Sequence, residues 1–241
     1  MHPILFYGVP EGCSLGTIVA LEWTGLPYRL CRIAMPGVVS GEAYRRINPV
    51  GETPALMTER GDVLSESLAI LNHVGARHVG ARALDSGLAF QQGSREFDRL
   101  NVLLAFLNTS FFNAFSPLWY ALEHGSAGSE KASLTAYGRA LVAKTHAQLE
   151  ALLDGRAWLL GERRTLADAY FYGIARWADF HQAVDRRDYP GLQGLFERLA
   201  DDPAVRFALA IEHGEDARSS GGFAGHVGLE DALQLLAREA A

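Results

Sequence analysis

The chain is poor in lysine, and its sequence predicts no export signal. Lys131 and Lys144 are its only lysines, and the formal net charge is −6 at pH 7. An acidic chain without a basic cluster is poorly suited to bind nucleic acid or an anionic membrane surface. The apolar N-terminal run is short and lacks a basic start, so it predicts neither a signal peptide nor a membrane span. We therefore expect a cytoplasmic protein with no transmembrane segment, whose partners are small molecules or other proteins.

Cysteine is equally scarce, with Cys13 and Cys31 alone. Two cysteines make neither a disulfide framework nor a zinc site, so we expect no bound metal. Their spacing also excludes the two-apart cysteine pair of dithiol oxidoreductases. In a reducing cytoplasm Cys13 would remain a thiol. Cys31 has apolar neighbours on a predicted strand and is expected in the core.

The composition is otherwise that of a folded globular protein, with 49% hydrophobic and 21% charged residues. Over the first eighty residues, strand and helix signals alternate in the order β-α-β-α-β-β-α. This order predicts a small mixed sheet with helices on its faces. We expect strands at 3–7, 28–33, 54–57 and 63–64, and helices that begin at Ser14, Glu42 and Ser65.

Beyond a linker at 75–90 that is rich in Gly, Ala and Arg, apolar residues recur with a helical period. This pattern predicts a bundle of five or more helices. The expected domains are an α/β domain at 1–80, an all-helical domain at 88–213 and a C-terminal extension at 214–241.

The extension begins with a stretch, 213–228, that is rich in Gly, Ser and charge, so we expect it to be mobile or loosely packed. Leu229, Leu233 and Leu236 then predict a last short amphipathic helix.

Two short segments of the first domain could carry binding chemistry. Thr53-Pro54 stands where a loop enters a predicted strand, and its proline is either an ordinary trans residue or a cis residue with a fixed-geometry role. Glu66-Ser67 opens a predicted helix, where backbone N–H groups favour a carboxylate ligand. Plain helix capping, with Ser65 as the cap, is the alternative.

Cys13 and Ser14 lie at the start of the first predicted helix. A helix start favours a thiolate, and a hydroxyl or thiol there can donate a hydrogen bond to a substrate thiolate. The alternatives are a buried apolar role for Cys13 and helix capping by Ser14. A separate signal, Thr165-Leu166-Ala167-Asp168, predicts a capping box that serves folding.

Several strings, taken in order and spacing, resemble the cytosolic glutathione S-transferase family. In the first domain they are Tyr7-Gly8-Val9-Pro10-Glu11-Gly12-Cys13-Ser14-Leu15, Asn48 to Leu56, and Ser65 to Ile70. Phe115-Ser116-Pro117-Leu118 and Thr165 to Tyr170 continue the likeness in the helical half. The N-terminal string is most similar to the bacterial beta class, which places a cysteine-serine pair at the start of its first helix.

The resemblance implies a thioredoxin-like N-terminal domain followed by an all-helical domain, usually in a homodimer. It implies that Pro54 is cis and that the backbone of Thr53 pairs with the cysteinyl backbone of glutathione. Glu66 and Ser67 would hold the γ-glutamyl group. Cys13 or Ser14 would stabilise the glutathione thiolate. Glutathione is then a co-substrate, and no metal is needed.

An apolar acceptor pocket is expected between the two domains. Its lining would be Tyr7, Phe112, Phe115, Trp119 and Tyr120, which suits a hydrophobic electrophile. Members of the beta class often carry a histidine-lysine pair three residues before the Phe-Ser-Pro-Leu string, where this chain has Phe112 and Asn113. The departure removes two polar groups from that wall.

Three functions fit these observations. The first is transfer of glutathione to an electrophile, with a role in detoxification. The second is a glutathione-dependent monothiol oxidoreductase that uses Cys13. The third is a non-catalytic interaction protein on the same fold, because fold does not determine function.

Overall fold

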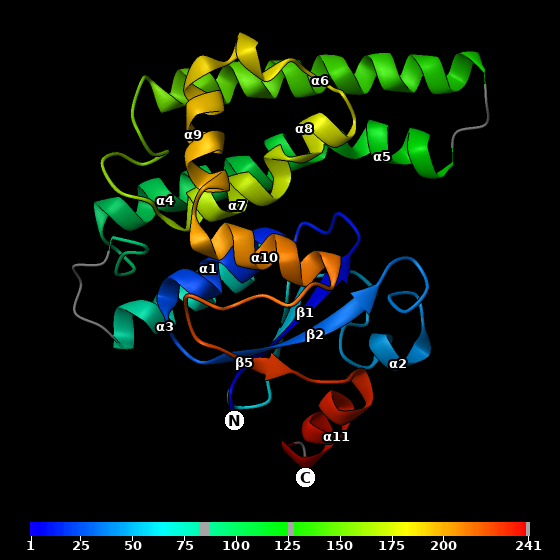
Figure 1. The fold of residues 1–241 in the computed structure, drawn as a ribbon, viewed down its shortest axis with the longest axis vertical. Coiled ribbons are helices and arrows are strands. Elements are labelled where there is room, and N and C mark those ends of the chain that lie inside the picture. Colours follow the sequence, from blue (N-terminus) through cyan, green and yellow to red (C-terminus); the bar gives the residue numbers. More distant parts are fainter. Residues whose placement is uncertain (82–86, 125–127, 240–241) are drawn as a thin grey trace. The chain divides into compact units, whose positions relative to one another are not determined.

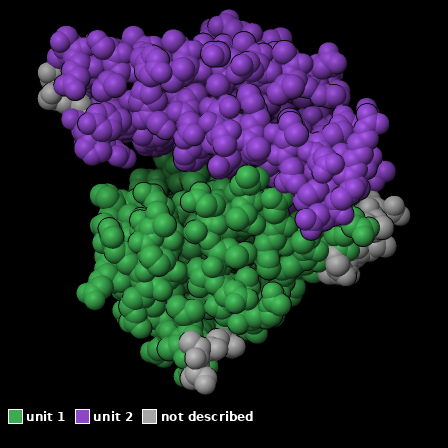
Figure 2. Space-filling model, turned by 180° about the vertical axis from the view of Figure 1, so that it is seen from behind, with its two compact units in different colours: residues 1–91, 201–241 green, residues 92–200 purple. Residues whose placement is uncertain are grey.

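The computed structural model describes residues 1–81, 87–124 and 128–239. The chain divides into two compact units, coloured in Figure 2. Unit 1 comprises 1–91 and 201–241, and unit 2 comprises 92–200. The division differs from the expected boundary at 213, because helix α10 (Pro203–His213) packs against α1 (Leu15–Thr24) of unit 1.

Unit 1 is built on a five-stranded sheet with the order β4-β3-β1-β2-β5. Strand β1 pairs in parallel with β2 and antiparallel with β3, while β3 and β4 form a hairpin. The strands are β1 (Ile4–Val9), β2 (Tyr28–Ala34), β3 (Ala55–Met57), β4 (Val63–Ser65) and β5 (Phe223–His226). The first four strands and the helices between them follow the order that the sequence predicts.

Helices cover both faces of this sheet (Figure 1). Helix α1 contacts α10 and also α3 (Ser67–Ala81). The opposite face carries α2 (Glu42–Arg45) and α11 (Leu229–Glu239), which contact each other. Alternate residues of the strands supply the core between sheet and helices on this second side, as the period of two requires. That core contains Ile4, Phe6, Cys31, Ile33, Val39, Tyr44, Ile47, Ala55, Met57, Val227, Ala232 and Leu233.

The C-terminal extension corrects one expectation. The stretch 213–228, expected to be mobile or loosely packed, contains β5, which lies beside β2 at the edge of the sheet (Figure 1). Its glycines are needed for close approach. A Cβ on Gly221 would stand 2.3 Å from the carbonyl oxygen of Glu22, and one on Gly222 would stand 2.1 Å from that of Leu26. The expected last helix is present as α11.

The described residues of unit 2 form helices joined by loops, with one isolated β-bridge in place of any strand. Its core is formed by apolar side chains that recur with the helical period. The helices are α4 (Arg95–Phe106), α5 (Ser116–Glu123), α6 (Ser129–Leu153), α7 (Leu166–Ala175), α8 (Trp177–Phe180) and α9 (Pro190–Ala200). A π-helical turn (Leu107–Phe112), a 3-10 turn (Asn113–Phe115) and a second 3-10 turn (Arg186–Asp188) complete the unit.

The predicted capping box at the start of α7 is confirmed. The Thr165 hydroxyl accepts from the Ala167 N–H, and the Asp168 carboxylate accepts from the Thr165 N–H at 2.7 Å. Asp168 also accepts from the Leu159 N–H at 2.9 Å and is fully buried. The motif therefore fixes both the helix start and the loop before it.

One helical run of unit 2, Arg95–Glu123, is long and apolar enough by composition to cross a membrane. No transmembrane segment was expected from the sequence, and this run was not singled out there. Five of its apolar side chains are buried within unit 2, namely Leu100, Leu104, Leu107, Phe111 and Phe115. Such a run is also typical of the core helix of a helical domain.

Candidate functional site

Three separate segments of unit 1 meet around the thiol of Cys13. The Cys13 S–H donates to the carbonyl oxygen of Thr53 at 3.5 Å. The same sulfur lies 3.8 Å from the hydroxyl oxygen of Ser67. These residues stand just before α1, just before β3 and at the first position of α3. The fold thus brings together residues that are 40 and 54 positions apart in the chain.

Two glycines allow these segments to approach. A Cβ on Gly8 would stand 2.2 Å from the Thr53 hydroxyl oxygen, and one on Gly12 would stand 2.2 Å from the carbonyl oxygen of Gly8. No larger residue fits either position without a shift of its neighbours. Both glycines belong to the N-terminal motif, but the sequence alone gave no sign of this role.

The segment before β3 is held by its own hydrogen bonds. The Thr53–Pro54 peptide bond is cis, the isomer that the resemblance implies. One residue earlier, the carbonyl oxygen of Glu52 accepts from the Tyr44 hydroxyl at 2.8 Å and from the Asn48 side-chain amide at 2.7 Å. These two donors fix the backbone that enters Thr53, and sequence reasoning missed both of them.

Glu66 and Ser67 stand at the start of α3, but not as a simple cap. Helix α3 begins at Ser67, whereas Ser65 is the last residue of β4, so the interpretation of Ser65 as the helix cap is wrong. Glu66 lies between them with φ +68°, a left-handed conformation that costs a non-glycine residue about 1 kcal/mol or more. Its side chain is exposed and available to a cationic group, while Ser67 is buried beside Cys13.

Cys13 and Ser14 have different surroundings. Ser14 is 1% exposed, and its hydroxyl oxygen accepts from the Gly8 N–H at 3.0 Å. Among the residues that the structure describes, no side chain caps α1, so the interpretation of Ser14 as a side-chain cap is wrong. Cys13 is half-buried and faces Thr53 and Ser67. Of the two, only the thiol faces these residues.

The second cysteine lies outside this cluster. Cys31 is buried on β2, as the sequence predicts, and burial raises the pKa of its thiol to about 12. It is therefore a protonated core residue at neutral pH. No group of three or more His, Cys, Asp or Glu side chains that could hold a metal ion occurs in the described parts of the chain.

The residues expected to line the acceptor pocket fall in both units. Tyr7 belongs to β1 of unit 1, where it is buried and its hydroxyl lies 3.5 Å from Nε2 of His226. Burial raises the pKa of this phenol, so it is neutral at pH 7. The other four residues belong to unit 2.

Three of those four, Phe112, Phe115 and Trp119, belong to a larger aromatic cluster, while Tyr120 stacks on His124 with ring centroids 4.7 Å apart. Trp177 contacts Phe112, Phe115 and Trp119 with ring centroids 5.3, 5.6 and 5.3 Å apart. His181 packs edge-on against Trp119 at 4.4 Å, and burial lowers its pKa to about 4, so the ring is neutral at pH 7.

The four expected residues of unit 2 differ in solvent exposure. Phe115 is buried, Phe112 and Trp119 are half-buried, and Tyr120 is 54% exposed. Neither Trp177 nor His181 was among the residues that the sequence predicted for this wall.

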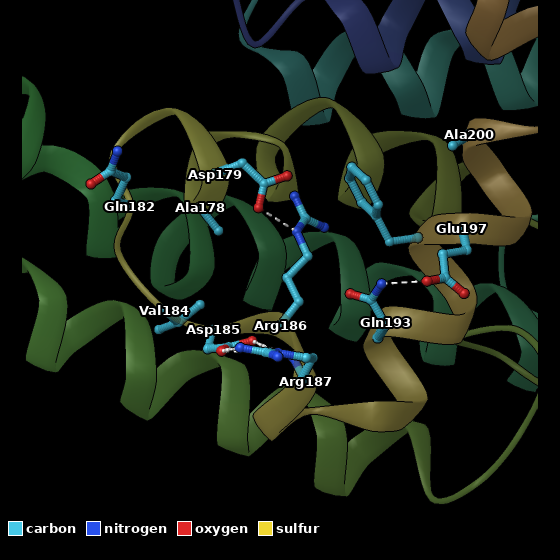
Figure 3. A pocket seen from close by; sticks show the side chains of 11 residues that line it. Ala178, Asp179, Gln182, Val184, Asp185, Arg186, Arg187, Gln193, Glu197 and Ala200 are labelled. Carbon is cyan, nitrogen blue, oxygen red and sulfur yellow. Dashed lines mark hydrogen bonds and ion pairs between the residues drawn. The ribbon is translucent and has the colours of Figure 1, made fainter.

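A pocket of about 710 Å³ opens in unit 2, apart from all of these residues (Figure 3). Its described lining comes from α8, α9 and the loop between them, at 178–200. Its charged groups are paired with each other, since Arg186 binds Asp179 at 2.8 Å and Arg187 binds Asp185. The Arg186 guanidinium also stands 3.4 Å above the ring of Phe196. Groups satisfied in this way favour a structural role for the pocket walls.

Comparisons with known proteins agree with this architecture. The family model for the glutathione S-transferase N-terminal domain matches residues 12–77, and that for the C-terminal domain matches 102–203. A curated relative, glutathione S-transferase GST-4.5 of Xanthomonas campestris, is 30% identical over 86% of this chain and 97% of its own.

Solved structures support the same fold. A sphingomonad glutathione S-transferase complexed with glutathione is 31% identical, with a TM-score of 0.74 over 87% of this chain and 98% of its own. A bacterial beta class enzyme of Sphingomonas chungbukensis is 27% identical, with a TM-score of 0.73 over 87% and 98%. These likenesses confirm the predicted thioredoxin-like domain and helical domain.

Proposed function

The chain belongs to the glutathione S-transferase family, and on that premise we propose that it joins the thiolate of glutathione to a hydrophobic electrophile. The observation that carries the proposal is the convergence of Cys13, Thr53 and Ser67 in unit 1. A peptide thiol bound there would meet a backbone carbonyl, a hydroxyl and a thiol within one small region.

Each part of glutathione has a matching group. The backbone of Thr53, turned by the cis bond to Pro54, pairs with the cysteinyl backbone of the ligand. Ser67 and the N-terminus of α3 receive the γ-glutamyl carboxylate, because free N–H groups and the helix dipole favour an anion there. The exposed Glu66 carboxylate meets the γ-glutamyl ammonium.

Cys13 is the proposed contact of the reacting sulfur. Its thiol donates a hydrogen bond in the structure, so it can donate to a glutathione thiolate and stabilise that charge relative to the thiol form. Ser14 is the weaker candidate, because it is 1% exposed, whereas Cys13 is half-buried. The thiolate then attacks the electrophilic carbon of the acceptor, and the leaving group departs with the electron pair of the broken bond.

The acceptor would rest on aromatic side chains of unit 2. Of the four expected residues in unit 2, Phe112, Trp119 and Tyr120 are accessible, whereas Phe115 is buried. Tyr7 is buried within unit 1. An apolar wall of this kind favours hydrophobic acceptors. A role in detoxification follows from that acceptor class.

Calorimetric titration with glutathione tests binding. We expect saturable binding to the full chain, weakened roughly tenfold in Ser67→Ala by loss of a charge-assisted hydrogen bond. Ser65→Ala is the matched control, since Ser65 lies two residues earlier in β4, and it should bind like the unmodified protein. No binding to the unmodified protein at millimolar glutathione would defeat the proposal.

A second function, monothiol reduction of disulfides, is favoured by the partial exposure of Cys13 and the burial of Cys31. A glutathionyl disulfide formed on Cys13 would be resolved by a second glutathione, because Cys31 is inaccessible. Cys13→Ala separates the two functions. Loss of thiol transfer with conjugation retained would favour the redox role, and loss of conjugation with thiol transfer retained would exclude it.

We further propose a cytoplasmic homodimer. Two free cysteines suit a reducing compartment. Large apolar side chains of unit 2, among them Val102 on α4 and Tyr137 on α6, are exposed in the single chain and would be covered in a dimer. Sedimentation velocity would show a species of twice the chain mass, and a monomer at micromolar concentration would contradict this.

A further inference from the structure

The C-terminal tail, residues 214–239, lies beyond the segments that the family models match, which end at 203. We infer that this tail positions the backbone of Glu52 and Thr53 for glutathione, through α11 and α2. The inference rests on the proposed function. It identifies a positioning element outside the cluster of Cys13, Thr53 and Ser67.

The tail is anchored first on a buried carboxylate of α1. Glu22 is 3% exposed and accepts from the Ser219 hydroxyl, the Ser220 N–H and the Gly221 N–H, each at 2.8 Å. The Tyr28 hydroxyl donates to the same carboxylate at 2.6 Å. This clasp, defined as Glu22 with residues 219–221, joins the tail to the first helix over nearly two hundred positions of the chain.

The clasp directs the next residues along the sheet edge. The Tyr28 N–H donates to Gly222 at 3.1 Å, and the Val227 N–H donates to Leu30 at 2.9 Å. The Arg29 guanidinium adds a bond to the carbonyl of His226 at 2.8 Å. These bonds determine where β5 ends and therefore where α11 begins.

Helix α11 then packs on α2. Its buried Ala232 and Leu233 share one core with Tyr44 and Ile47, and Tyr44 is fully buried within it. A surface helix of this kind is held by its apolar face. The position of the Tyr44 ring consequently depends on α11 as well as on the sheet.

Tyr44 completes the path to the glutathione segment. Its hydroxyl donates to the Glu52 carbonyl, next to Thr53, and Asn48 donates to the same oxygen. A shift of α2 would loosen these bonds and change the angle at which the backbone enters Thr53. The tail would then affect glutathione affinity without touching the ligand.

Gly221→Ala in the full chain tests this inference, because the new Cβ would stand 2.3 Å from the Glu22 carbonyl oxygen and open the clasp. We expect the KM and Kd for glutathione to rise roughly threefold to tenfold, with kcat at saturating glutathione unchanged. Gly228→Ala is the matched control, since its Cβ would meet no atom closer than 3.5 Å, and it should behave like the unmodified protein.

Two further variants keep the test decisive if Gly221→Ala folds poorly. Leu233→Ala weakens the α11 packing on α2 and should raise the Kd in the same direction. Tyr44→Phe keeps that packing but removes the bond to Glu52, and it should reproduce the Kd effect. Because the tail acts in part through the Tyr44 bond, Gly221→Ala combined with Tyr44→Phe should raise the Kd by less than the product of the two single effects.

The contrary results are distinct. If Gly221→Ala and Leu233→Ala lower the melting temperature but leave the glutathione Kd unchanged, the tail is only a stabilising edge and the inference is wrong. If the increases in Kd caused by Gly221→Ala and Tyr44→Phe multiply in the double variant, the tail does not act through Tyr44. If the unmodified protein binds no glutathione, the proposed function itself fails.

Discussion

Each unit contains a buried carboxylate that accepts from several backbone groups, Asp168 in unit 2 and Glu22 in unit 1, and the two sites are built differently. In unit 2, Asp168 is fully buried and accepts from residues three and nine positions away. In unit 1, Glu22 accepts from residues 197 to 199 positions away. The first arrangement begins a helix and is local, whereas the second closes the tail onto α1. A local motif can be recognised in a sequence, but a long-range clasp cannot.

The partners of the two carboxylates also differ in burial. Asp168 binds the buried Thr165 and Leu159. Glu22 binds Ser220 and Gly221, which are exposed and can form hydrogen bonds with water instead. Loss of the carboxylate should therefore cost more in unit 2 than in unit 1, because a buried donor left unpaired loses its full solvation.

Asp168→Ala should have the largest effect on stability. It leaves buried N–H groups of Leu159 and Thr165 without an acceptor, and we expect a loss of about 3 kcal/mol in the free energy of unfolding. Chemical denaturation measures this. Asp98→Ala, in the exposed first turn of α4, is the control and should change stability by about 0.5 kcal/mol or less. An equal loss in both variants would show that the burial of Asp168 is unimportant.

The buried His146 of unit 2 should make stability sensitive to acid. Burial lowers its pKa from 6.5 to about 4, so the folded state binds this proton less readily than the unfolded state. Its contribution is fully present above pH 6.5 and is lost as the pH falls towards 4, by about 3 kcal/mol. His146→Leu should remove this loss, as denaturation at several pH values would show.

Asp168 titrates in an overlapping pH range, and its effect on stability has the opposite sign. Burial raises its pKa to about 6, so its contribution is fully present below pH 3.8 and declines as the pH rises towards 6. Because Asp168 is present in both proteins, the difference between the unmodified protein and His146→Leu isolates the histidine. A difference that does not grow between pH 6.5 and 4 would contradict the assignment.

Glu22→Ala should have an intermediate effect. The buried Tyr28 hydroxyl loses its acceptor while the tail amides gain water, so we expect a loss of about 2 kcal/mol. Hydrogen exchange should accelerate at the amides of β5 and leave α7 of unit 2 unchanged. A loss equal to that of Asp168→Ala would remove the contrast between the two carboxylates.

Ser14→Ala should have the smallest effect. It removes the acceptor of the Gly8 N–H, for a loss of about 1 kcal/mol in stability. Because Ser14 is buried behind Cys13, the glutathione Kd should change less than about twofold. A larger change in Kd with unchanged stability would show that Ser14 takes part in glutathione binding.

The features that could be predicted from the sequence are those set by local sequence patterns. Strand and helix periods located the four strands of the first domain, and the spacing of Thr165 and Asp168 identified the capping box. Turn and helix signals marked Thr53 and Ser67, but only the fold brings them to Cys13, because the contacts span 40 and 54 positions.

The failures have a common physical cause. Glycines at 221 and 222 suggested a loosely packed segment, but a side chain there would collide with the backbone of Glu22 and Leu26. Ser14 has the residue type of a helix cap, but Gly8 takes its hydroxyl. In each case a backbone group outside the local sequence pattern decided the outcome.

The most direct test of the account is hydrogen exchange of the full chain with and without saturating glutathione. We predict slower exchange at the amides of Thr53 and Ser67 in unit 1, and unchanged exchange along the pocket at 178–200 in unit 2. Protection confined to 178–200, or no protection at Thr53 and Ser67 under conditions where calorimetry detects binding, would contradict the glutathione site in unit 1.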